Sequence, residues 1–97
     1  MAEGCEIKGT VINSIISTGC IVEEKAVVKD SVIMPNTVIK KGAAVKYSII
    51  SENVTVSRNA RVGDEKEYYP ESEWGIAVVG KGNTIPDNDL VKPDQII

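Results

Sequence analysis

The sequence of 97 residues contains no histidine. A histidine general base and a histidine zinc site are therefore both excluded. The two cysteines, Cys5 and Cys20, lack the paired spacing of a thiolate metal site. No glycine-rich phosphate loop is present, since Gly80-Lys81-Gly82 fits a simple turn. We predict that the chain contains no catalytic residue, no cofactor-binding residue and no metal ligand.

Aromatic residues are also scarce, with no phenylalanine, one tryptophan and three tyrosines. Valine and isoleucine dominate the apolar set, which favours β-structure built from thin aliphatic layers. No apolar run approaches the ~20 residues of a membrane span, and no basic segment followed by an apolar one opens the chain. We therefore expect a cytoplasmic protein with no membrane partner.

Neither sign of charge dominates the sequence. The net charge is −3, and acidic and basic residues are interspersed. Nucleic-acid binding needs a basic face that neutralises phosphates. We therefore expect no nucleic-acid partner.

One short pattern occurs three times at a fixed spacing. Ser14, Ser31 and Ser48 are 17 residues apart, and each follows a valine by three positions and precedes two aliphatic residues. Self-similarity at a short period indicates a solenoid, whose repeats bury apolar surface only by stacking.

The 17-residue period, applied to residues 4–63 without insertion or deletion, predicts stacked columns of small and aliphatic side chains. These columns are Cys5, Val22, Ile39 and Val56; Val11, Val28, Val45 and Val62; Gly9, Ala26, Ala43 and Ala60; and the pairs Ile15-Ile16, Val32-Ile33 and Ile49-Ile50. The sequence does not decide which member of each pair faces the core, although Val28 and Val32 are the favoured inward residues of their repeat.

Each coil is built from units of six residues: an aliphatic residue, a polar one, two that tolerate turns, a small one and a variable one. Val22–Val27 is a clear copy. This pattern resembles the hexapeptide repeat of left-handed parallel β-helices. We therefore predict an all-β, single-stranded left-handed parallel β-helix with a triangular cross-section and 17-residue coils.

The same register places the two cysteines in different columns. It stacks Cys5 on Val22 and Cys20 on Thr37. We interpret both cysteines as small reduced residues at or near the core.

The chain divides into three parts. Residues 4–63 are predicted β-helix coils, residues 64–74 an acidic excursion loop, and residues 75–97 a final coil and tail, in which Val79, Ile85 and Val91 recur at intervals of six. The loop is interpreted as a solvated segment whose aromatic residues fold back over one face, with a partner-contacting loop as the alternative. Because the pattern begins at Gly4 without a polar cap, we expect a preceding domain or a partner chain there.

Three segments carry a closer resemblance. Gly4–Val11, Ala26–Pro35 and Gly75–Lys81, the last followed by Ile85-Pro86, are similar to the C-terminal β-helix of bacterial ADP-glucose pyrophosphorylase (glucose-1-phosphate adenylyltransferase). The resemblance extends from Gly4 to about Val91.

The resemblance implies that a catalytic domain, which binds ATP and magnesium, lies N-terminal and is missing from this chain. The complete enzyme would make ADP-glucose and pyrophosphate from ATP and glucose 1-phosphate for glycogen biosynthesis. The implied partners are that catalytic domain and other subunits, in a homo-oligomer or in a hetero-oligomer with a paralogue.

In that family the β-helix also helps to form an allosteric effector site. One basic position of that site corresponds to Lys81, which is the candidate effector-binding residue. The other corresponds to Glu52, whose carboxylate would repel a phosphorylated effector.

Two alternatives stay open. One is a self-contained β-helix that acts as an interaction or oligomerisation module. The other is a fragment of a hexapeptide-repeat acyltransferase, which the absence of histidine disfavours.

Overall fold

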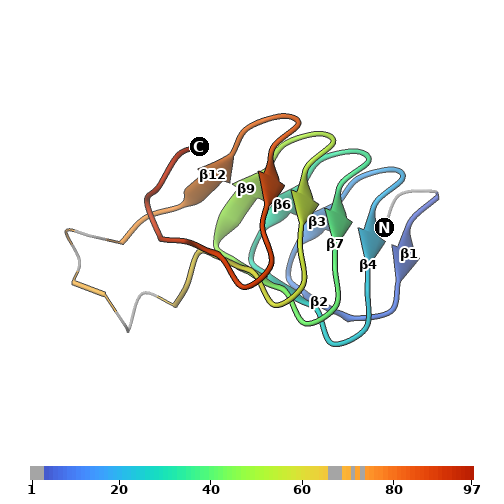
Figure 1. Cartoon of the computed structure of the whole chain (residues 1–97), viewed down its shortest axis with the longest axis horizontal. Helices are drawn as coiled ribbons and strands as arrows, with labels where there is room; N and C mark the ends of the chain where they lie inside the picture. Colours follow the sequence, from blue (N-terminus) through green and yellow to red (C-terminus); the bar gives the residue numbers. More distant parts are fainter. Residues whose placement is uncertain (1–3, 66–68, 71, 73) are drawn as a thin grey trace.

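The computed structural model describes residues 4–65, 69–70, 72 and 74–97. The strands of this part of the chain form three parallel sheets, one on each flat side of a stack of coils (Figure 1). The first sheet has the order β1 (Glu6–Ile7), β4 (Ile21–Val22), β7 (Val38–Ile39), β10 (Thr55–Val56) and β13 (Thr84–Ile85). The second has the order β2 (Thr10–Ile12), β5 (Val27–Lys29), β8 (Ala44–Lys46), β11 (Arg61–Val62) and β14 (Leu90–Val91). The third has the order β3 (Ile15–Ile16), β6 (Val32–Ile33), β9 (Ser48–Ile50) and β12 (Ala77–Val79).

Each complete coil contributes one strand to each sheet, which confirms the predicted left-handed parallel β-helix. The 17-residue period is the pairing register over most of the stack. Val11 pairs with Val28, and Val28 with Val45. No described helix is long and apolar enough to cross a membrane.

The core is the narrow triangular interior, filled by one aliphatic column per side. Val28, Val45 and Val62 are fully buried, and so are the corner residues Ala26, Ala43 and Ala60. The residues expected to complete the stack, Val79, Ile85 and Val91, are also buried. These columns are confirmed.

The aliphatic pairs place their second member inside. Ile33 is fully buried, whereas Val32 lies half-buried on the outer side of β6. The expectation that Val32 points inward is therefore wrong. Successive strand residues alternate between faces, and the burial of Ile33 fixes Val32 on the outside.

The first coil departs from the predicted register. Ile7, not Cys5, stacks on Val22, and Cys5 lies over Cys20, because Glu6 donates its backbone N–H to the Cys20 carbonyl. The predicted separation of the two cysteines into different columns is therefore wrong. The cause is a corner two residues shorter than its successors, in which Gly9 takes the place of Ala26. A side chain at Gly9 would collide with the Ala26 carbonyl.

Corners of the coil require left-handed backbone. Positive φ angles occur at asparagine or aspartate in several corners, including Asn36, Asn53, Asn59 and Asn88, because these side chains tolerate this region best after glycine. Lys25 and Tyr47 also adopt it, with φ of 64° and 47°.

The chain leaves the stack after Gly63 and returns to it at β12 (Figure 1). The aromatic residues of this loop were predicted to fold back over one face of the stack. One of them, Tyr68, lies outside the described residues. The chain resumes its register with Val79 opposite Ile50. Near the C-terminus, Ile96 forms a parallel bridge to Val78 and so extends the third sheet by one rung.

Candidate functional site

Lys81, the candidate effector contact, lies exposed on the turn after β12. Because Val79 pairs with Ile50, the register puts Lys81 over Glu52 on the preceding coil. The backbone confirms this placement, since the Gly82 N–H donates to the Glu52 carbonyl at 3.1 Å. The two positions that the resemblance assigns to an effector site are therefore neighbours of opposite charge.

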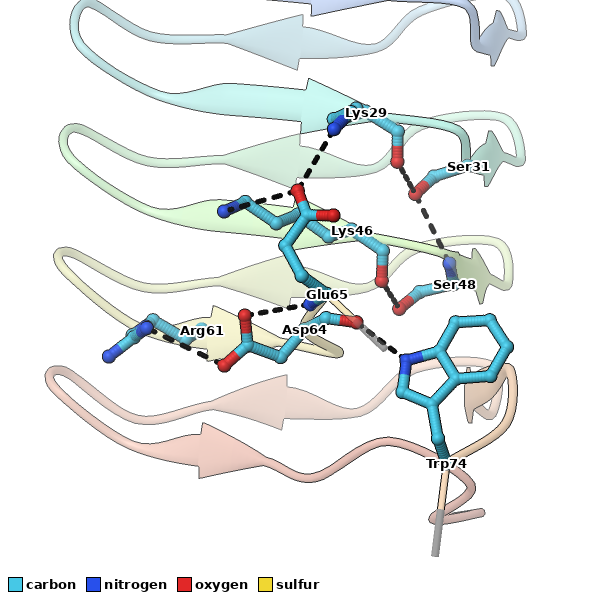
Figure 2. Close-up of polar contacts among 8 residues, drawn as sticks. All are labelled: Lys29, Ser31, Lys46, Ser48, Arg61, Asp64, Glu65 and Trp74. Carbon is cyan, nitrogen blue, oxygen red and sulfur yellow. Dashed lines mark hydrogen bonds and ion pairs between the residues drawn. The ribbon is translucent and has the colours of Figure 1, made fainter. Parts of the chain in front are cut away.

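A second polar cluster, the loop clamp, fastens the start of the excursion to the second sheet (Figure 2). It consists of Lys29, Lys46, Tyr47, Glu65 and Trp74. The Lys29 Nζ donates to the Glu65 Oε1 at 2.9 Å, and the Lys46 Nζ lies 3.9 Å from the same oxygen. Lys29 and Lys46 pair in register on adjacent strands, so one carboxylate spans two coils.

The aromatic half of the loop clamp holds the end of the excursion. The ring of Trp74 meets that of Tyr47 edge-on, with centroids 5.4 Å apart. Its indole Nε1 donates to the Asp64 backbone carbonyl at 2.8 Å. Trp74 therefore lies back on the stack and ties the two ends of the excursion together.

The charges of the loop clamp shift one another's ionisation. The hydrogen bond from Lys29 lowers the pKa of Glu65, and the same bond raises the pKa of Lys29. Desolvation, followed by the charge of Glu65, raises the pKa of Tyr47. All three shifts favour an ion pair of charged Lys29 and Glu65 beside a neutral phenol at neutral pH.

A ladder of serines supports the corner beside the loop clamp. Ser31 and Ser48 donate their hydroxyl hydrogens to the carbonyls of Lys29 and Lys46, at 2.8 and 2.7 Å. Each hydroxyl of Ser14 and Ser31 also accepts the backbone N–H of the serine on the next coil. The ladder thus fixes the carbonyls of both lysines whose side chains hold Glu65.

The sequence predicted Lys81 as an effector contact, which stays a prediction, and it gave no prediction of the loop clamp. Lys29 and Lys46 are separated by one repeat period, and acidic residues open the excursion. These two signals together could have pointed to a contact between a repeated lysine and the loop, but the prediction did not use them. The partner itself could not be chosen, because Lys29 and Glu65 are 36 residues apart and meet only through the tertiary fold.

Chemically, both clusters are suited to binding and fastening. In the described part of the chain no group of three or more acidic or cysteine residues could hold a metal ion. Both cysteines are free thiols, and burial raises the pKa of Cys20.

Comparison with known proteins identifies the family. A family model described as GlmU-like, C-terminal hexapeptide, matches residues 1–79. A search of curated proteins found no match. The matched residues include every strand from β1 to β12, which is most of the stack described above. The chain belongs to the GlmU-like C-terminal hexapeptide family.

Proposed function

We propose that the chain is the C-terminal structural and regulatory domain of a glucose-1-phosphate adenylyltransferase. Its fold is a hexapeptide-repeat domain of the GlmU-like type. The finer assignment is supported by the ordered segments Gly4–Val11, Ala26–Pro35 and Gly75–Lys81, which resemble that enzyme. In this proposal ATP and magnesium bind a separate N-terminal domain, and the complete enzyme works in the cytoplasm on glucose 1-phosphate in glycogen biosynthesis.

The observation that carries the regulatory role is the position of Lys81. The segment Gly75–Lys81 returns to the third sheet as β12, and the turn after this strand exposes Lys81 over Glu52. An anionic effector that approaches Lys81 therefore meets a carboxylate as well. We infer that this domain responds weakly to phosphorylated effectors.

The test uses the complete product of the native gene. We expect it to form ADP-glucose from ATP, glucose 1-phosphate and Mg²⁺. Absence of a nucleotide-binding domain from that product, or absence of this activity, contradicts the proposal.

Regulation is tested with a sugar bisphosphate as the probe. Glu52→Lys places two cations on adjacent coils and should lower the probe concentration for half-maximal response, and Lys81→Ala should raise it. Lys41→Ala, at an exposed corner elsewhere, is the control and should leave the response unchanged. Equal responses in all four proteins would remove Lys81 from the effector site.

A further inference from the structure

The two cysteines of the chain are direct neighbours in one column of the interior. The Glu6 N–H donates to the Cys20 carbonyl at 3.0 Å, and Glu6 pairs with Ile21, so Cys5 lies against Cys20 on the next coil. Neighbouring strands of a sheet lie ~4.8 Å apart, and a disulfide needs Cα atoms roughly 4.4–6.8 Å apart. The spacing of the first two coils therefore suits a disulfide between these two residues.

The two thiols are held in the same way on successive coils. The Cys5 Sγ donates to the Ser17 carbonyl at 2.8 Å, and the Cys20 Sγ donates to the Met34 carbonyl at 3.1 Å. The strand pairing of β3 with β6 makes these two carbonyls equivalent positions of adjacent coils. The two sulfur atoms therefore point toward the same corner of the coil, one above the other.

The next residue of this column shows that the position does not require a thiol. It is Thr37, which is fully buried and whose hydroxyl donates to the Ser51 carbonyl at 2.8 Å. A hydroxyl thus makes the same kind of bond to the equivalent carbonyl. What a pair of thiols adds at this place is exchange with a disulfide, a reaction that hydroxyls do not undergo.

The two thiols differ in their access to solvent. Cys5 is half-buried, as are Ile7 and Val11, the other inward residues of the first coil, whereas Cys20 is fully buried. Burial raises the pKa of the Cys20 thiol, and a charge on Cys5 adds to this rise. The thiolate is the nucleophile in disulfide exchange. An oxidant in solution therefore meets Cys5 first, and Cys20 reacts second.

We propose that Cys5 and Cys20 are a reversible disulfide site, which takes a small-molecule disulfide as its oxidant and joins the first two coils covalently. The Cys5 thiol loses its proton, and its sulfur attacks one sulfur of the small disulfide. A mixed disulfide forms, and one thiolate leaves. The Cys20 thiol then loses its proton and attacks the Cys5 sulfur, which expels the second thiolate. Two protein thiols are oxidised, and the small disulfide is reduced to two thiols that take up the two protons.

The new bond closes a covalent loop through residues 5–20. Such a loop restricts the unfolded chain, so oxidation should hold the first coil on the second. Where thiols are kept reduced, disulfides of this kind are transient and report the redox state. The inference goes beyond the proposed function and does not depend on it.

The first test treats the reduced chain of residues 1–97 with excess oxidised glutathione under native conditions. Free thiols are then alkylated, and trypsin, which cleaves after Lys8, separates the two cysteines. We expect a linked pair of peptides, residues 1–8 with residues 9–25, and an intact mass lower by two hydrogen atoms. Dithiothreitol added before alkylation should reverse both changes.

Two variants establish the order of the steps, and both use the residue that the column already carries at Thr37. Cys20→Thr should retain one glutathione on Cys5, because no second thiol displaces it. In Cys5→Thr, Cys20 should react at least about tenfold more slowly than in the parent, because it is buried and has lost its neighbouring partner. Cys5→Ser and Cys20→Ser repeat the test if threonine does not fit at either place.

The second test is hydrogen exchange of the backbone amides. Glu6 and Lys8 donate to carbonyls of the second coil, and their exchange should slow at least about tenfold on oxidation. Val38 and Lys40 donate to the fourth coil and are the control, with exchange unchanged.

Four outcomes would overturn the proposal. They are cysteines that stay unlinked in the folded parent, a glutathione that persists on Cys5 of the parent, linkage only between separate chains, and a linked chain whose Glu6 amide exchanges as before. None of these measurements involves adenylyltransferase activity, so the proposed function succeeds or fails separately.

Discussion

The Ser31 hydroxyl oxygen accepts a hydrogen bond from the backbone N–H of Ser48 at 3.2 Å, and so links two successive coils. The same hydroxyl donates to the Lys29 carbonyl at 2.8 Å. Ser48 is 1% exposed, so water cannot replace the bond that its N–H makes. The repeated serine is therefore a structural element of the corner.

Ser31→Ala should destabilise the fold. It leaves the buried N–H of Ser48 without this acceptor, which costs about 1–3 kcal/mol. Urea denaturation should show a lower midpoint with an unchanged slope. Ser17→Ala, on the outer side of the stack, is the control. An equal fall of the urea midpoint in both variants would mean that the serine ladder makes no specific contribution to stability.

A charge in the buried valine column should reduce the stability of the fold more than the loss of a serine hydroxyl does. Val28 is fully buried between Val11 and Val45, its partners on the adjacent coils. Val28→Asp buries a carboxylate among aliphatic side chains and should cost at least ~3 kcal/mol. Val27→Asp changes the neighbouring outward residue of β5 and should cost much less. Thermal unfolding at equal temperatures for both variants would contradict the inward assignment.

The sequence predicted the repeated part of the fold because identical residue types recur at one spacing. Val11, Val28 and Val45 could be aligned without knowledge of the structure. Cys5 and Ile7 could not be distinguished as the partner of Val22, since both are apolar and either fits a narrow core. The two-residue deletion before Thr10 therefore left no signal in the pattern.

The outward position of the first member of each aliphatic pair was hidden for a related reason. In the pairs Ile15-Ile16 and Val32-Ile33 both members are aliphatic, so polarity does not alternate along the strand. The contact of Lys29 with Glu65 depends on where the excursion starts, which the fold alone determines. Lys81 was proposed through its likeness to a family motif, and its role in effector binding stays a prediction.

The loop clamp should make stability depend on pH. Because the folded-state pKa of Glu65 lies below its ordinary 4.5, its contribution is complete above that pH and is lost as pH falls through the lowered value. The raised pKa of Lys29 acts in the other direction, so its contribution is present below 10.5 and is lost at higher pH. Urea midpoints measured from about pH 6 to about pH 3 should fall less steeply in Glu65→Gln than in the parent protein. Glu24→Gln, at an exposed corner, should retain the parent's slope, and parallel curves for parent and Glu65→Gln would contradict a role for this ion pair.

The corner at Lys25 offers a stabilising substitution. Lys25 has a φ of 64°, and the equivalent corner positions of later coils carry Gly42, Asn59 and Asn88, all at positive φ. Asparagine tolerates left-handed backbone better than lysine does, so Lys25→Asn should relieve local strain and stabilise the fold by about 0.5–1 kcal/mol. Lys40→Asn removes the same charge on the same side of the stack, at a residue without positive φ, and should give no such gain. Thermal and urea denaturation of the two variants separate backbone strain from charge, and an equal shift in both would assign the effect to charge alone.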